Sequence, residues 1–107
     1  MTKEMKKRIL RELYSYPQNK DISRVIKDYL QVNKELFTTL AIINSIECAL
    51  AELPHEIREY AQKKFFCKNY YTPSGLAMEL NVSIRTIQRW EELLLQTIAG
   101  YFVLIDW

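Results

Sequence analysis

Apolar residues recur every three or four positions along most of this chain, which is the spacing of residues on one face of an α-helix. In residues 3–14 the apolar stripe consists of Met5, Ile9 and Leu13, and charged residues cover the other faces. This pattern predicts a short amphipathic helix. We expect the helix to end near Tyr16-Pro17, because the residue before a proline is disfavoured in helical geometry.

A longer pattern runs from Gln18 to Leu53, a stretch without glycine or proline. Its apolar positions alternate at spacings of four and three residues, as in a heptad seam with polar interruptions. The seam consists of Ile22, Ile26, Tyr29, Asn33, Leu36, Leu40, Ile43, Glu47 and Leu50. One long helix and two helices with a break near Gln31 to Lys34 fit equally well, and we prefer the break. Intrachain packing is the favoured use of the seam, with a dimer interface as the alternative.

Two shorter helices are predicted in the next part of the chain. After Leu53-Pro54, the spacing of apolar residues indicates a helix over residues 55–68. Thr72 is a suitable N-cap for a second helix over residues 73–80. Pro73 suits the first position of that helix, where the missing N–H group would have no helical partner in any case.

The last predicted helix runs from Ile84 to about Ala99, where Ser83 can cap its start and Gly100 is expected to end it. The apolar tail YFVLIDW, residues 101–107, is too short and isolated for a sheet, so we expect it to pack onto the helices or onto another subunit. Only two glycines and three prolines occur in 107 residues, which favours long helices. The predicted fold class is all-α, with a helical N-terminal region over 1–53 and a second region over 54–107, or one compact unit of both.

The segment LAMELNVSIRTIQRWEELL, residues 76–94, has the residue types of a helix-turn-helix, in which two helices meet steeply across a tight turn. Ala77 is small enough to let the second helix approach. Asn81 tolerates the left-handed conformation that the turn requires. Ile87 and Trp90 lie one turn apart and are suited to anchor the second helix by its inner face. These residues predict a C-terminal helix-turn-helix.

Residues on the outer side of this second helix are polar, basic or aliphatic, and no acidic residue occurs before Glu91. In the major groove of DNA, arginine recognises guanine edges, glutamine recognises adenine edges, and serine or threonine reaches bases or phosphates. The candidate base-reading residues are Ser83, Arg85, Thr86, Gln88 and Arg89. The candidate phosphate contacts are Lys63, Lys64, Lys68, Thr72 and Ser74. A tight helical hairpin that does not bind DNA is the alternative interpretation.

The net charge of +2 is small for a protein that binds nucleic acid strongly without sequence preference. Positive charge is concentrated in residues 1–11, where Glu4 is the single acidic residue. The basic residues there are Lys3, Lys6, Lys7, Arg8 and Arg11. This cluster is either a solvated helix face or an additional phosphate contact, and its narrow apolar stripe disfavours a membrane-surface role. We expect any DNA binding to be weak in the isolated chain or to be aided by a partner.

The sequence contains no residue pattern of an enzyme, a cofactor site or a metal site. Cys48 and Cys67 lack metal-ligand spacing, and His55 is the one histidine. Glu91 and Glu92 are adjacent on a predicted helix, so they point about 100° apart and do not form a catalytic pair. We therefore predict no catalytic residue, no metal and no cofactor. The chain has no apolar run of about 18 residues, so we expect no membrane association. Its charged N-terminus lacks the apolar core of a secretory signal, so we expect a cytoplasmic protein with two reduced, packed cysteines.

Residues 51–99 resemble the region-four helix-turn-helix of bacterial sigma factors. The matching residues are Leu53-Pro54, Arg58, Leu76-Ala77, Leu80, Val82-Ser83, Thr86-Ile87 and Trp90. The upstream segment LRELYSYPQNKDISRVIKDYL, residues 10–30, carries an L-x-x-Y-P element followed by a charged helix. With this element the chain is similar to the RinA/ArpU-type late-gene transcription activators of phages that infect Gram-positive bacteria.

This resemblance implies an all-helical activator that binds a promoter upstream of phage structural or packaging genes and acts with host RNA polymerase. It also implies that Arg85, Gln88 and Arg89 read bases and that Ser83 and Thr86 position the helix. Asn81 departs from the glycine that is commoner in the turn.

The favoured function is sequence-specific binding of double-stranded DNA in transcription regulation. The alternatives are a small terminase subunit that recognises packaging-site DNA and a module that binds a sigma factor or polymerase without contacting DNA. The expected partners are double-stranded DNA, host RNA polymerase and a second copy of the chain, in the cytoplasm of a bacterial host.

Overall fold

A computed structural model describes residues 2–26, 34–67 and 71–103 of the chain. Within these ranges the chain forms five α-helices and no β-strand, which confirms the predicted all-α class. The helices are α1 (Lys3–Ile26), α2 (Lys34–Glu52), α3 (His55–Phe65), α4 (Pro73–Leu80) and α5 (Ile84–Phe102). The predicted break near residues 31–34 falls mostly on residues 27–33, which lie outside the described residues, and α2 begins directly after them at Lys34.

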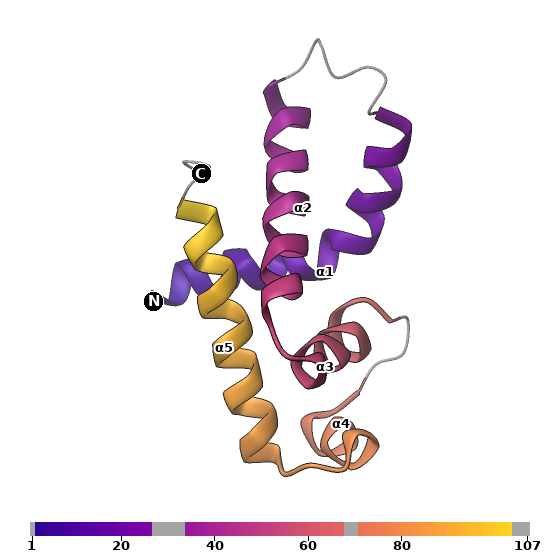
Figure 1. Ribbon diagram of the computed structural model, residues 1–107, viewed down its shortest axis with the longest axis vertical. Helices are drawn as coiled ribbons and strands as arrows, with labels where there is room; N and C mark the ends of the chain where they lie inside the picture. Colours follow the sequence, from indigo (N-terminus) through magenta and orange to yellow (C-terminus); the bar gives the residue numbers. More distant parts are fainter. Residues whose placement is uncertain (1, 27–33, 68–70, 104–107) are drawn as a thin grey trace.

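The helix α5 is the element around which the others are arranged. It packs against α1, α2, α3 and α4. Figure 1 shows α2 and α5 running side by side, with the first part of α1 crossing behind them. The short helices α3 and α4 lie beside the N-terminal half of α5, at the lower end of the molecule in Figure 1. This arrangement leaves α4 and the start of α5 at one tip of an elongated molecule of 47 × 28 × 23 Å.

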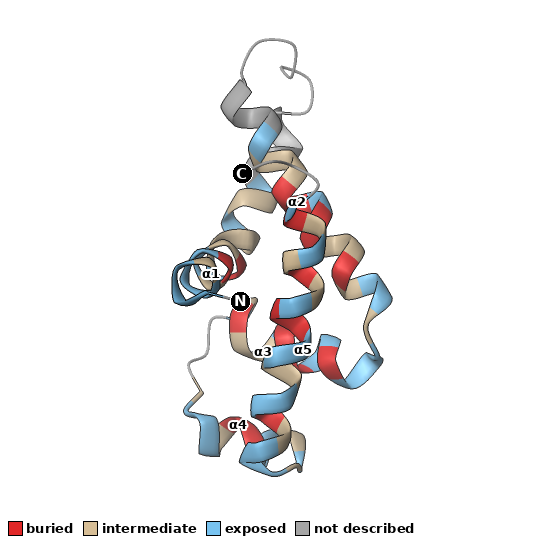
Figure 2. Ribbon diagram, turned by 90° about the vertical axis from the view of Figure 1, so that its left-hand side faces the viewer, coloured by how far each residue is buried: buried red, intermediate tan, exposed pale blue. Residues whose placement is uncertain are grey.

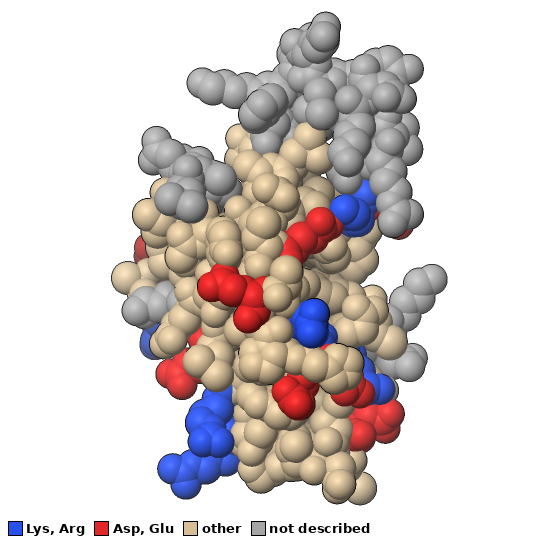
Figure 3. All heavy atoms as spheres, viewed as in Figure 1, with Lys and Arg blue, Asp and Glu red and all other residues tan. Residues whose placement is uncertain are grey.

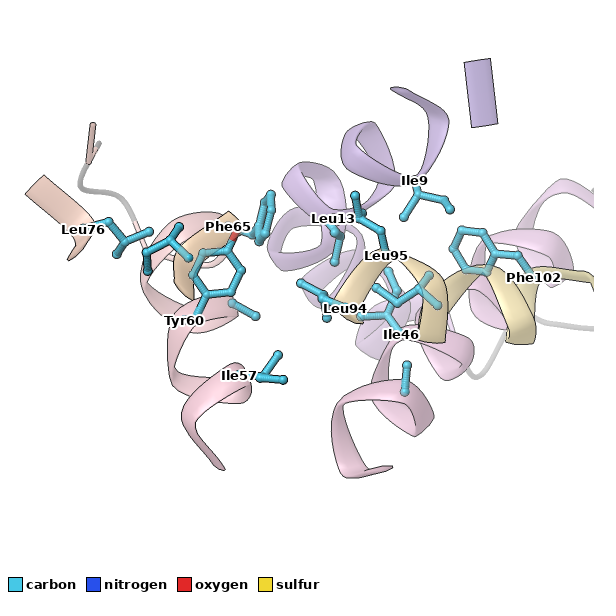
Figure 4. Packing of buried hydrophobic residues seen from close by; sticks show 14 of the residues in the cluster. Ile9, Leu13, Ile46, Ile57, Tyr60, Phe65, Leu76, Leu94, Leu95 and Phe102 are labelled. Carbon is cyan, nitrogen blue, oxygen red and sulfur yellow. The ribbon is translucent and has the colours of Figure 1, made fainter. Parts of the chain in front are cut away.

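One hydrophobic core contains side chains from all five helices. Figure 4 shows how Ile9 and Leu13 of α1 meet Leu94, Leu95 and Phe102 of α5. The fully buried members with the largest side chains are Tyr60, Phe102, Ile9, Leu13, Ile46, Leu76, Leu94 and Ile98. The predicted boundary between residues 53 and 54 falls at the turn between α2 and α3, and this core has members on both sides of it.

The prediction that the first helix ends near Tyr16-Pro17 is wrong, because α1 continues through Pro17 to Ile26. Proline inside a helix removes one backbone hydrogen bond and crowds the carbonyl group four residues earlier, which bends the helix. Figure 1 accordingly shows α1 changing direction along its length. Contacts of Tyr16 compensate, since its ring lies 4.7 Å from that of Phe66 and its hydroxyl donates to Glu47 at 3.0 Å. Tertiary contacts therefore outweigh the local preference of the proline.

The prediction that Gly100 ends the last helix is also wrong, because α5 continues to Phe102. A glycine in a helix interior costs about 1 kcal/mol relative to alanine. Burial of a phenylalanine side chain stabilises by about 1.5–3 kcal/mol, and Phe102 is fully buried. The gain from packing Phe102 thus exceeds the cost of Gly100. The expected packing of the tail onto the helices is seen for Phe102, while residues 104–107 lie outside the described part.

The predicted heptad seam is only partly the buried face of α2. Ile43 is a seam position and is buried, but the other buried α2 residues, Ile42, Ser45, Ile46 and Ala49, lie beside the seam. The seam residue Glu47 accepts the hydrogen bond from Tyr16 and forms an ion pair with Lys20, both on α1. The polar residue Glu47 in the seam therefore has its binding partners within the chain. Seam positions 22, 26, 29, 33 and 36 have no described side chain.

Candidate nucleic-acid interface

The helix α4 begins with the cap that the sequence predicts. Thr72 has extended backbone angles, and its hydroxyl oxygen accepts a hydrogen bond from the N–H group of Gly75 at 3.0 Å. Pro73 occupies the first helical position. A Cβ atom on Gly75 would lie 3.1 Å from the Thr72 hydroxyl oxygen, so glycine leaves room for this cap. These features fix where α4 starts and how it enters the tip of the molecule.

The chain turns sharply at Asn81, directly after α4. Asn81 has φ 56° and ψ 45°, and it is the one non-glycine residue with positive φ in the described part of the chain. The N–H group of the next residue, Val82, donates to the carbonyl oxygen of Ala77 at 2.9 Å. This left-handed residue with a backward hydrogen bond is a common way to end a helix. It allows α4 and α5 to be joined by only three residues.

The start of α5 is fixed by Ser83. Its side-chain oxygen accepts a hydrogen bond from the Thr86 N–H group at 3.1 Å, and the two hydroxyl oxygens lie 3.0 Å apart. Such a cap stabilises a helix by about 1 kcal/mol. The Ser83 and Thr86 hydroxyl groups are thus already bonded to each other and to the helix end, which suits a positioning role better than a base-reading role.

The inner side of the α4–α5 corner is apolar and closely packed. Leu76, Ala77 and Ile87 are buried, as their spacing predicts. Trp90 is partly buried against the core, and its ring lies 6.2 Å from the ring of Tyr60 on α3. The corner is therefore held by contacts to α3 as well as by its own turn.

The outer side of the same corner carries the remaining base-reading candidates. Arg85, Gln88 and Arg89 are all exposed, and Ile84 at the first position of α5 is 42% exposed. Figure 2 shows that the lower tip, where α4 lies, is largely exposed. Figure 3 shows basic side chains gathered at the lower left, beside the N-terminal part of α5. Neither arginine forms an ion pair with a residue that the structure describes.

Two of the candidate phosphate contacts are engaged in ion pairs that tie α3 to the corner. Lys63 lies 3.3 Å from Glu79 of α4, and Lys64 lies 3.3 Å from Glu91 of α5. The hydrogen bond to Glu79 raises the pKa of Lys63. Phosphate binding by either lysine would require exchange of its carboxylate partner.

The other candidates are placed differently. Ser74 is exposed on α4, and Thr72 is exposed at its cap. Lys68 lies outside the described residues.

Sequence reasoning missed the carboxylate partners of these lysines and the environment of Tyr60. The pairs join residues 16 and 27 positions apart, and no local spacing reveals such contacts. Tyr60 is fully buried, and its hydroxyl has no hydrogen-bond partner in the described structure. Burial, followed by the nearby Glu91 and Tyr14, raises the pKa of the Tyr60 hydroxyl far above its usual value.

Other chemistry-bearing residues do not gather at this surface. Among the described residues, no group of three or more His, Cys, Asp and Glu side chains could hold a metal ion. His55 is exposed at the start of α3, 3.8 Å from Glu59. Cys48 is half-buried, whereas Cys67 is exposed, which corrects the expectation that both thiols are packed. None of the helices, as far as the structure describes them, has the length and apolar character needed to cross a bilayer.

Comparison with known proteins adds no further guide to this surface. Protein-family models, curated proteins and solved structures were compared with the chain, and none of them matches. The resemblance to phage activators and to sigma region four therefore rests on the quoted residues alone.

Proposed function

We propose that α4, the turn at residues 81–83 and α5 act as a helix-turn-helix that binds a specific sequence of double-stranded DNA. In this proposal the first two turns of α5 enter the major groove, and α4 lies across the backbone. The left-handed turn at Asn81 and the packed side of the corner support it, because a reading helix has to be held rigidly at a steep angle to its neighbour.

The observation that carries the proposal is the exposed pair Arg85 and Arg89 with Gln88 beside them. Residues four apart in a helix lie one above the other, so the two guanidinium groups occupy successive turns of one side. Arginine binds the O6 and N7 atoms of guanine with two hydrogen bonds, and glutamine pairs likewise with adenine. Both arginines lack an ion-pair partner among the described residues, so binding a base edge would break no described ion pair.

Backbone contacts are proposed at the start of α4. Ser74 is exposed there, and the N-terminal end of a helix attracts phosphate through its unpaired N–H groups and its dipole. Such contacts position a protein on the duplex and carry no sequence information. Lys63 and Lys64 would add to them only after leaving Glu79 and Glu91.

The biological setting follows from the resemblance. A chain similar to phage late-gene activators would bind a promoter in the bacterial cytoplasm and act with host RNA polymerase. We propose this role for the chain as a transcription regulator.

The proposal is tested by selecting bound fragments from a random pool of duplex DNA and measuring affinity for the recovered site. Arg85→Ala is expected to weaken specific binding by about 1–3 kcal/mol and to relax the preference at one base pair. Arg58→Ala serves as the control for loss of one exposed arginine, since Arg58 is also exposed but lies on α3, outside the α4–α5 corner. Unchanged affinity after Arg85→Ala would contradict the docking. Affinity that does not fall with rising salt would contradict DNA binding itself, because no phosphate counterions would be released.

A further inference from the structure

The outer side of the first turn of α5 combines two different chemistries. Ile84 and Gln88 lie one turn apart on one ridge, and Arg85 and Arg89 lie one turn apart on the next. Three of these side chains are of types that can form hydrogen bonds with base edges, whereas Ile84 is aliphatic and nevertheless 42% exposed. An isolated exposed aliphatic residue is ordinary on a protein surface. Ile84 differs from such a residue because it lies among the side chains that we propose to contact bases.

If α5 binds in the major groove through Arg85 and Gln88, the Ile84 side chain contacts the base edges as well. Most groups that line the major groove are hydrogen-bond donors and acceptors, and covering them with an aliphatic side chain leaves them unpaired. The C5-methyl group of thymine is the apolar feature among the base edges. Contact between this methyl group and Ile84 removes apolar surface of both from water.

The two hydroxyl groups next to Ile84 do not compete for the same base. Ser83 and Thr86 are bonded to each other and to the helix end. The first helical turn therefore offers Ile84 and Arg85 as its outward-reaching side chains. With Gln88 and Arg89 from the second turn, the set favours a site in which guanine and adenine edges stand near a thymine.

We propose that Ile84 is a specificity-determining residue that recognises the C5-methyl group of one thymine in the bound DNA. This inference rests on the proposed helix-turn-helix function and adds a base identity to it. It also assigns to the exposed Ile84 side chain a role that neither helix formation nor the protein core requires, since α5 is capped by Ser83 and anchored by Ile87 and Leu94.

The test replaces each thymine of the selected site in turn by deoxyuridine, which removes the methyl group and keeps every hydrogen-bonding atom. Affinity of the full chain is measured at one fixed salt concentration. We expect one position at which the replacement weakens binding about three- to five-fold, the effect of one buried methyl group. Ile84→Ala is expected to bind the thymine and deoxyuridine sites equally at that position.

Leu93→Ala is the matched control. Leu93 is also an exposed aliphatic residue of α5, at 47% exposure, but it lies nine residues further along, about 14 Å from Ile84 on the helix axis. This variant should discriminate thymine from deoxyuridine as the wild type does. Circular dichroism is used to check that both variants keep their helices.

The outcomes separate the two proposals. Specific binding that responds to deoxyuridine at no position, or that responds equally in Ile84→Ala and the wild type, overturns the role of Ile84 and leaves the proposed function intact. Failure to select any specific site overturns the proposed function, and the role of Ile84 with it.

Discussion

Replacement of Tyr60 by phenylalanine should make the protein more stable. The Tyr60 side chain is fully buried between α3 and α5, and its ring lies 6.2 Å from the rings of Phe65 and Trp90. Its hydroxyl group is buried without a hydrogen-bond partner in the described structure. Tyr60→Phe keeps the ring and removes only this oxygen atom. The variant therefore isolates the cost of one unpaired buried hydroxyl group.

The size of the effect follows from two opposing contributions. An unpaired buried hydroxyl group costs about 1–3 kcal/mol, because it loses its hydrogen bonds to water and gains none in the protein. Removal of the oxygen also forfeits a few dispersion contacts, each worth about 0.1–0.2 kcal/mol. The net stabilisation is about 1–2 kcal/mol. For a chain of 107 residues, each kcal/mol corresponds to an increase in Tm of about 4–8 °C.

The assay is urea unfolding followed by circular dichroism, since the described chain is mostly helical. The midpoint should rise for Tyr60→Phe while the slope stays constant. Tyr101→Phe is the control, because it deletes the same atom from a hydroxyl group that donates to Glu52 at 2.6 Å, and it should not stabilise. A Tyr60→Phe variant less stable than the wild type by more than about 0.5 kcal/mol would refute the reasoning, since an unpaired hydroxyl group cannot stabilise the fold.

Three further predictions concern the turn after α4, the C-terminal part of α5 and the ionisation of Tyr60. The left-handed backbone of Asn81 predicts that Asn81→Gly keeps the stability of the protein, whereas Asn81→Ala lowers the free energy of unfolding by about 1 kcal/mol. Thermal unfolding distinguishes the two variants, and equal stabilities would contradict the left-handed conformation at residue 81. A Cβ atom on Gly100 would meet nothing within 4 Å, so Gly100→Ala should stabilise by about 0.5–1 kcal/mol, whereas a loss would show that α5 is not helical there. Because folding raises the pKa of the Tyr60 hydroxyl group, this group ionises in the unfolded chain, at about pH 10, before it ionises in the folded protein. The free energy of unfolding of the wild type should therefore fall more steeply above this pH than that of Tyr60→Phe. Parallel pH profiles of the two proteins would contradict the raised pKa.

Local chemistry explains the parts of the structure that could be predicted from the sequence. Thr72, Ser83 and Asn81 each act within a few residues of chain, through a cap or a tolerated backbone angle, and all three occur where the sequence placed them. The buried stripe of Ile9 and Leu13 likewise needs only helical periodicity. Such features depend on neighbours in the chain rather than on the completed fold.

The errors arose where distant contacts override local preference. Pro17 and Gly100 are unfavourable inside helices, yet both helices continue through them. In α1, Tyr16 next to the proline contacts Phe66 and Glu47, and in α5 the burial of Phe102 stabilises the helix beyond Gly100. Contacts between residues 16 and 47 or between residues 16 and 66 cannot be read from spacing, because nothing local marks them as partners.

The small net charge of the chain does not argue against a DNA-binding surface, because the charges are not evenly compensated. Lys63 and Lys64 are paired with Glu79 and Glu91, which neutralises those four residues near the corner. Arg85 and Arg89 form no ion pair with any described residue, and they lie in the N-terminal part of α5, toward the end where the helix dipole is positive. Since screening in physiological salt limits such fields to about 8 Å, a duplex bound as proposed would experience this local charge rather than the net +2 of the whole chain. We therefore expect Arg89→Gln to weaken DNA binding more than Lys63→Gln does. If the lysines instead supplied the main attraction, Lys63→Gln would weaken DNA binding at least as much as Arg89→Gln.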